Sequence, residues 1–188
     1  MPISSLIRNL GIFSLFGGLL MIVTQIWFLV NPEAFTAEYL DHFAFVLILL
    51  GMIGIYIAQF DKLGVPGFIT FILMIASMSL WLGAKWFITF AINDIDKANP
   101  ELLENGLETV GMGFTISLYS LFLFIFIFGI LLAVKGTLPR IPAYLIILCP
   151  LVDFVPYGSN ISQMVAGVAF TWLGYALWKG KQGEVSSG

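Results

Sequence analysis

The strongest constraint on this chain is a set of long apolar segments that contain almost no charged residue. The stretch FLFIFIFGILLAV, residues 122–134, has no polar side chain at all. A helix that crosses the hydrocarbon region of a bilayer needs about 20 predominantly apolar residues. Segments of about this kind cover residues 9–30, 42–60, 67–92, 113–134, 140–157 and 160–178. They predict an all-α polytopic membrane protein, a six-transmembrane-helix bundle that forms a single domain over residues 1–188.

The overall composition agrees with this class. Hydrophobic residues make up 60% of the chain and charged residues only 10%, whereas a soluble domain averages about 45–50% apolar and about 25% charged residues. There are too few polar side chains to cover a water-facing globule. The apolar residues run continuously and do not alternate, so helices are expected and strands are not. The formal net charge of −3 argues against nucleic acid as a partner, and membrane lipid is the expected surrounding.

Small and polar residues recur at helical spacing on one face of three of these segments. The stripes are Gly11, Ser14, Gly18 and Gln25; Gly51, Gly54 and Ala58; and Gln163, Gly167, Thr171 and Gly174. Small residues let membrane helices approach closely, and polar residues hydrogen-bond between them. The stripes therefore predict a tightly packed bundle, with a role for Gln25 or Gln163 in ligand binding as the less favoured interpretation.

The basic residues predict the orientation in the membrane. They gather at the N-terminus, in the second and fourth loops and at the C-terminus: Arg8, Lys62, Lys135, Arg140, Lys179 and Lys181. Six crossings place these four regions on one side and leave only Lys97 on the other. Because cytoplasmic loops of membrane proteins are enriched in lysine and arginine, we expect a multi-pass protein of the cell membrane with its N-terminus and C-terminus in the cytoplasm.

One lysine lies inside a predicted span. Lys85 interrupts SMSLWLGAKWFITFAIN, roughly 10 Å below the outer surface at 1.5 Å per helical residue. A charge at the centre of a membrane helix costs about 2.5–3.5 kcal/mol on insertion scales. The only acid inside a predicted span is Asp153, roughly 6 Å below the same surface and flanked by Pro150 and Pro156. Because the two charges share the outer third of the bilayer, the sequence predicts a Lys85–Asp153 ion pair.

Further polar and aromatic residues share this depth, whereas the inner halves of the spans are almost entirely apolar. The asymmetry predicts an outward-facing polar pocket closed below by apolar side chains. The candidate ligand-binding residues are Lys85, Asp153, His42, Gln25, Trp81, Tyr119 and Gln163. The function that we expect is binding of a small or lipidic ligand by a sensor, a transport component or an immunity-type protein. Lys85 would bind an anionic group, and Asp153 would hold Lys85 in place.

Plainer interpretations of the same residues stay open. Lys85 could extend its flexible stem toward the interface, and Asp153 lies close enough to the surface to be hydrated. The two could also form an ion pair with a purely structural role, in a structural or interaction protein that binds no ligand. Glu38, Asp41 and His42 offer oxygen and nitrogen ligands within one helical turn. Such triplets are common on surface helices, and we predict no metal site.

Motifs of membrane enzymes are largely missing. The chain has one histidine, His42, which excludes the His-Glu-x-x-His zinc motif and haem ligation by two histidines. The single cysteine, Cys149, excludes an intrachain disulfide and a cysteine-based zinc site. No P-loop or dinucleotide fingerprint occurs, and no cofactor is indicated. A membrane enzyme that uses Lys85, Asp153 and His42 for acid–base chemistry is the third alternative.

Two segments resemble small six-span bacterial membrane proteins that carry no assigned activity. They are DHFAFVLILLGMIGIYIAQF, with His42 near the start of the second span, and VAGVAFTWLGYALWKGK, with the run from Trp172 to Trp178. The resemblance implies a bacterial origin and a location in the cell membrane, and it implies no chemistry.

The layout is also similar to the substrate-binding subunits of energy-coupling-factor vitamin transporters, which have six spans, both termini inside and an outward ligand pocket. The first span of those subunits usually carries an Ala-x-x-x-Ala contact for the transport partner. Here LGIFSLFGGLL has glycine and serine instead. A vitamin-binding subunit is therefore kept as an alternative in which the partner contact differs.

Overall fold

The computed structural model of the chain describes residues 2–32, 34–99, 101, 108–156 and 158–180, without the side chains of residues 93 and 96. Two residues used in the sequence predictions lie outside these ranges: Tyr157, the end of the predicted fifth span, and Lys181, a basic residue of the C-terminus. The elements are α1 (Ile3–Val30), α2 (Phe35–Phe87), a π-helix η1 (Ile88–Ile92), α3 (Asn93–Ala98), α5 (Glu108–Lys135), α6 (Arg140–Val152) and α7 (Gly158–Trp178). The described ranges contain no β-strand, so the all-helical prediction is confirmed.

Four of these helices are long and apolar enough to cross a membrane: α1, α2 together with η1, α5 and α7. α6 is apolar but has only 13 residues. Large hydrophobic side chains are exposed along the outside of the bundle, for example Phe16, Leu80 and Val134, whereas polar side chains such as Ser14 and Gln59 are fully buried. This distribution suits a lipid environment. The prediction of a helical chain with several membrane-crossing candidates is confirmed.

Gly64 divides α2 into two antiparallel arms, residues 35–63 and 65–87, which we call the first and the second arm. Gly64 has a φ of 58° and a non-helical ψ of −156°, a conformation that costs glycine little because it has no Cβ. Pro66 lies two residues further along the chain. Across the hairpin the rings of Tyr56 and Phe71 stack with their centroids 4.0 Å apart. The predicted second and third spans are therefore the two arms of one hairpin.

The helix bounds differ from the predicted ones at several ends. α1 begins at Ile3 and α2 at Phe35, both about six residues earlier than the apolar runs. α6 ends at Val152, five residues before the predicted end. Pro150 lies in its last turn and lacks the N–H that would continue the hydrogen-bond ladder. A short turn then leads to Gly158, whose N–H donates to the Val155 carbonyl at 2.7 Å.

The small-residue stripes predicted from the sequence lie at the helix contacts. α1 packs between α7 and the first arm of α2. A Cβ added at Gly18 would collide with the carbonyl oxygen of Gly167, and one at Gly51 would collide with Ser14. The Ser14 hydroxyl donates to the Phe170 carbonyl at 2.8 Å. The prediction of tight packing through these stripes is confirmed.

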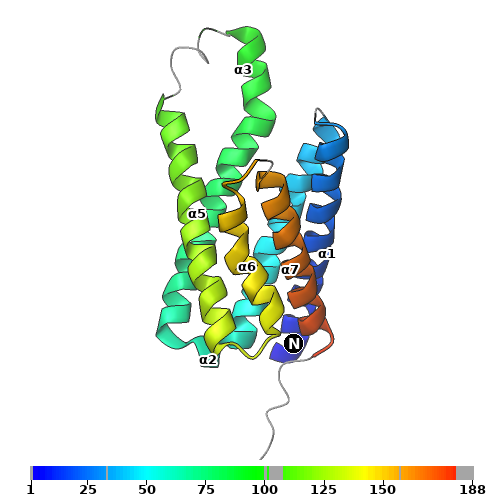
Figure 1. Cartoon of the computed structure of the whole chain (residues 1–188), viewed down its shortest axis with the longest axis vertical. Helices are drawn as coiled ribbons and strands as arrows, with labels where there is room; N and C mark the ends of the chain where they lie inside the picture. The colour runs from blue at the N-terminus through cyan, green and yellow to red at the C-terminus, as the bar shows by residue number, and fades with distance from the viewer. Residues whose placement is uncertain (1, 33, 100, 102–107, 157, 181–188) are drawn as a thin grey trace, which may run out of the picture.

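The two ends of the bundle differ (Figure 1). The start of α1, the hairpin turn of α2, the α5–α6 connection and the end of α7 lie together at one end, which we call the basal end, and α3 lies at the other. At the basal end, the side-chain amide of Gln59 holds Thr137 between α5 and α6. The Gln59 carbonyl oxygen accepts the Thr137 backbone N–H at 2.6 Å, and the Gln59 amide nitrogen donates to the Thr137 hydroxyl at 3.0 Å. The exposed basic residues Arg8, Lys62, Lys135, Arg140 and Lys179 belong to segments at this end.

Candidate functional site

Lys85 forms an ion pair with Asp41, not with Asp153. The Lys85 ammonium on the second arm contacts Oδ2 of Asp41 on the first arm. The Asp41 side chain is 0% exposed and that of Lys85 is 18% exposed. The predicted Lys85–Asp153 pair was wrong because we placed Asp41 in a loop before the second span. α2 instead begins at Phe35, which makes Asp41 a buried helical position that the hairpin brings opposite Lys85.

The remaining oxygen of the Asp41 carboxylate is also occupied. Oδ1 accepts hydrogen bonds from the Thr24 hydroxyl at 3.0 Å and from the Gln25 amide at 2.9 Å. The Lys85 ammonium additionally lies 4.8 Å from the centre of the Phe45 ring, within the range of a cation–π interaction. A buried charge is tolerated when it is paired and hydrogen-bonded. The Lys85 charge is therefore neutralised inside the protein.

Gln25 extends these contacts to α7. Its amide nitrogen also donates to Oε1 of Gln163 at 3.0 Å, and its carbonyl oxygen accepts from the Asn160 amide at 3.2 Å. We call the connected side chains the polar network: Thr24, Gln25, Asp41, Lys85, Asn160 and Gln163. The polar network joins α1, both arms of α2 and α7. It fixes the position of Gln163, which also borders the cavity described next.

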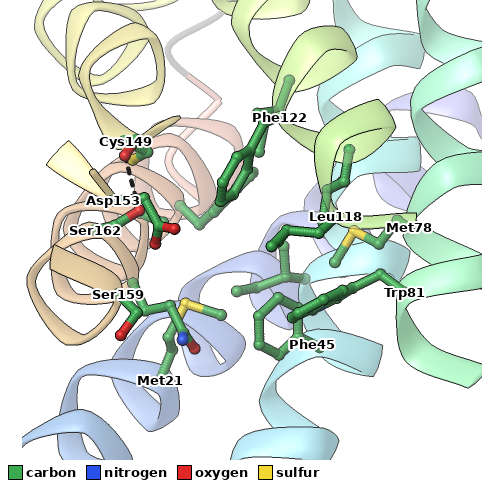
Figure 2. Close-up of a pocket in the computed structure, with 16 residues that line it drawn as sticks. Met21, Phe45, Met78, Trp81, Leu118, Phe122, Cys149, Asp153, Ser159 and Ser162 are labelled. Carbon is green, nitrogen blue, oxygen red and sulfur yellow. Dashed lines mark hydrogen bonds between the residues drawn. The ribbon is translucent and has the colours of Figure 1, made fainter. Parts of the chain in front are cut away.

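A central cavity of about 200 Å³ lies among the helices (Figure 2). Residues of α1, both arms of α2, α5, α6 and α7 form its walls, from Met21 to Phe170. Aromatic and aliphatic side chains form most of the surface. Figure 2 shows Phe45, Met78 and Trp81 on one side and Cys149, Asp153, Ser159 and Ser162 on the other. The predicted polar pocket is thus a mainly apolar cavity whose polar residues gather on one side.

Asp153 is the charged residue of this cavity. It caps the C-terminal end of α6, and its carboxylate points into the cavity (Figure 2). Within the part of the chain that the structure describes, no hydrogen bond or ion pair reaches this carboxylate. The neighbouring Ser162 hydroxyl donates to the Cys149 carbonyl at 2.8 Å. On this side of the cavity the Asp153 carboxylate therefore offers acceptor oxygens, while the Ser162 hydroxyl proton is already donated.

A second hollow, the lateral groove, lies between the end of the second arm with η1 and the start of α5. It has a volume of about 550 Å³ and is lined by apolar residues such as Leu80, Ile88 and Ile116, all of which are exposed. Phe114 lines the lateral groove, and Trp81 lines the central cavity. The rings of Trp81 and Phe114 have centroids 4.8 Å apart. This aromatic pair separates the two hollows.

His42 and Tyr119 have other surroundings. Nδ1 of His42 is buried and has no hydrogen-bond partner among the described residues, and its ring lies 6.5 Å from that of Phe90. Tyr119 is 54% exposed and does not line the central cavity. In the described ranges no group of three or more His, Cys, Asp or Glu side chains could hold a metal ion. Neither residue takes part in the polar network.

The candidates from the sequence thus fall into three groups. Trp81, Asp153 and Gln163 line the central cavity, Gln25 and Lys85 belong to the polar network with Gln163, and His42 and Tyr119 belong to neither. Asp41, Thr24 and Asn160 were not among the candidates. Comparisons of the chain with protein-family models, with curated proteins and with solved structures found no match.

Proposed function

We propose that this chain is a membrane protein that crosses the bilayer six times and binds a small apolar or amphiphilic ligand in the central cavity. The six crossings are α1, the two arms of α2, α5, α6 and α7. The exposed basic residues at the basal end support a cytoplasmic basal end with both chain termini, by the preference of lysine and arginine for cytoplasmic loops. Exposed acids, among them Asp94 and Glu108, lie on segments at the opposite end. The ligand site then belongs to the outer half of the bundle.

The observation that carries this proposal is the central cavity itself. Protein interiors are close-packed and contain few voids larger than a water molecule. Here a partly open cavity of about 200 Å³ lies in a bundle whose helices elsewhere approach to the limit that glycine allows. An apolar cavity of about 150 Å³ holds one benzene molecule. A ligand of roughly eight to ten non-hydrogen atoms therefore matches the available space.

The polar network supports the cavity wall, but it provides no free charge for binding the ligand. Asp41 neutralises Lys85, so an anionic ligand at Lys85, as the sequence suggested, is not part of this proposal. Gln163 links the polar network to the wall of the cavity through Gln25. The polar network then acts as a scaffold that holds the cavity wall in place, in the way that supporting hydrogen bonds keep binding residues in position.

The lateral groove offers a route from the bilayer. It is apolar and lies on the lipid-facing side of the second arm and α5, separated from the central cavity by the rings of Trp81 and Phe114. The π-helix Ile88–Ile92 borders it, and π-helical turns are frequent at functional sites. An amphiphilic ligand dissolved in the outer leaflet would enter when this aromatic pair moves apart.

A structural or interaction protein without a ligand is the second candidate. The completeness of the hydrogen bonds around Asp41 favours it, because a fully paired network needs no ligand to be stable. A substitution that fills the cavity distinguishes a ligand-binding protein from a structural or interaction protein. Ala166 lines the central cavity, and Val168 on the same helix is exposed on its outer face. Ala166→Phe and Val168→Phe therefore add a ring inside and outside the cavity.

The test uses the full chain, purified in detergent, and 2-phenylethanol as the probe. A ligand that binds only the folded state raises the unfolding temperature in a concentration-dependent manner. We expect 2-phenylethanol to raise the unfolding temperature of the wild type and of Val168→Phe, but not that of Ala166→Phe. An equal response of all three proteins, or no response of the wild type up to the solubility limit, would contradict ligand binding in the central cavity.

A further inference from the structure

We propose that the central cavity selects a ligand with a cationic head, an alkylammonium or arylalkylammonium group bound by the carboxylate of Asp153. This inference rests on the proposed function, because it names the class of ligand for the same cavity. It goes beyond the proposed function by assigning a charge to the ligand and a recognising residue to the protein.

Asp153 carries a charge that the described part of the protein does not match. Asp153 is the one charged residue among those that line the central cavity, and its carboxylate points inward (Figure 2). Among the described residues no basic side chain pairs with it, and the only salt bridge found there joins Lys85 to Asp41. Asp153 is partly buried, and an opposite charge close to such a carboxylate favours its ionised form. A cation on the ligand would supply the missing partner.

Lys85, a basic residue on the same arm as the cavity residue Trp81, is already paired. Lys85 lies one helical turn from Trp81, which lines the cavity, but the Lys85 ammonium is held by Oδ2 of Asp41 and by the face of Phe45. Withdrawing it would leave the Asp41 carboxylate buried without a counter-charge, which is strongly destabilising. Lys85 is therefore not free to neutralise Asp153.

The polar atoms beside Asp153 are partly engaged in hydrogen bonds within the protein. The Ser162 hydroxyl gives its proton to the Cys149 carbonyl, which leaves lone pairs on the Ser162 oxygen. The Gln163 side-chain oxygen already accepts from the Gln25 amide, so the Asp153 carboxylate supplies the acceptors that face the cavity. An ammonium group has three donors and no acceptor, whereas a carboxylate ligand would place acceptors against acceptors.

The apolar walls suit the rest of such a ligand. Trp81, Phe122 and Phe170 line the cavity, and aromatic faces attract cations in addition to packing against apolar groups. The volume of about 200 Å³ admits roughly eight to ten non-hydrogen atoms. Phenethylamine, 2-phenylethanol and phenylacetate are all close to this size. At neutral pH they carry a positive, a zero and a negative charge on the same apolar body.

The experiment measures binding of these three probes to the full chain by thermal unfolding in detergent at several probe concentrations. A hydrogen bond to a charged group contributes about 1.5–3 kcal/mol, which corresponds to about ten- to hundredfold in affinity. We expect phenethylamine to bind the wild type at least about tenfold more tightly than 2-phenylethanol, and phenylacetate to bind more weakly than both. This comparison needs no variant.

Two variants then test whether Asp153 causes the preference for the amine. In Asp153→Asn the advantage of phenethylamine over 2-phenylethanol should disappear, while 2-phenylethanol still binds. Asp94→Asn removes the same charge from an exposed position on α3 and should retain the preference of the wild type. Equal binding of the amine and the alcohol to the wild type, or a preference that survives in Asp153→Asn, would overturn the cationic assignment and leave the proposed function intact. Failure of all three probes to bind the wild type would instead contradict the proposed function.

Discussion

Lys85 and Asp41 lie 44 positions apart in the sequence and form an ion pair between the two arms of the α2 hairpin. The pair depends on the turn at Gly64, which sets the register of the arms. Thr24 and Gln25 of α1 complete the hydrogen bonds of the Asp41 carboxylate. Lys85, which lies in the apolar second arm, is thus neutralised by Asp41 of the first arm, and α1 holds Asp41 in place. The Lys85–Asp41 pair should therefore contribute to the stability of the fold.

Replacing one member of this pair should destabilise the protein far more than replacing both. Lys85→Met leaves the Asp41 carboxylate buried without a counter-charge, and we expect a loss of about 3–5 kcal/mol in the free energy of unfolding. The double variant Lys85→Met/Asp41→Asn keeps an acceptor for Thr24 and Gln25 and should recover most of that loss. Unfolding in mixed micelles with increasing denaturing detergent measures both values.

The control for this prediction pairs Lys85→Met with Asp153→Asn. Asp153 takes no part in the polar network, so its neutralisation should not restore stability. Recovery by Asp153→Asn that equals the recovery by Asp41→Asn would contradict the assignment of Asp41 as the partner of Lys85.

The contact between α1 and α7 should be sensitive to a single methyl group. Gly18→Ala would place its Cβ against the backbone of Gly167 and the side chain of Thr171, and such overpacking typically costs about 1–3 kcal/mol. Gly83→Ala on the second arm meets no atom within 4 Å and should be neutral or stabilising by up to about 1 kcal/mol. The unfolding temperatures of the two variants in one detergent test this. Similar values for both would show that α1 and α7 do not approach as closely as described.

The aromatic pair between the lateral groove and the central cavity should control the rate of binding. Phe114→Ala removes one ring of the pair with Trp81 and widens the route, so phenethylamine should associate and dissociate several times faster with little change in affinity. Leu123→Ala changes an exposed residue of the same helix and serves as the control. Ligand exchange measured by NMR gives both rates. Unchanged rates in Phe114→Ala would argue for access from the water-facing end.

The sequence predicted those parts of the structure that depend on local patterns. The glycine and serine stripes on the first, second and sixth spans identified the close helix contacts at Gly18 and Gly51, because small residues at helical spacing have few other uses in apolar helices. The apolar runs located most helices to within several residues. Their ends were less certain, since capping turns and the first helical turns, such as FTAEYLDH before the second span, carry polar residues.

The depths of the charged residues within the predicted spans did not identify the ion-pair partner of Lys85. Asp41 lay just outside the apolar run, and only the register of the hairpin at Gly64 brings it opposite Lys85. The spacing of Ala37, Asp41, Ala44 and Ile48, all of them buried, follows one helical face and would have identified Asp41 as an inward position. The central cavity depends on how side chains from five helices meet, which no single segment specifies.

Ligand binding in the central cavity can be tested most directly with a ligand that carries a heavy atom. Crystals of the full chain soaked with 4-bromophenethylamine should show an anomalous bromine peak inside the central cavity, between Trp81 and Phe122, with the amine toward Asp153. A bromine peak confined to the outer, lipid-facing surface, with the cavity empty at saturating concentration, would contradict the proposed ligand site.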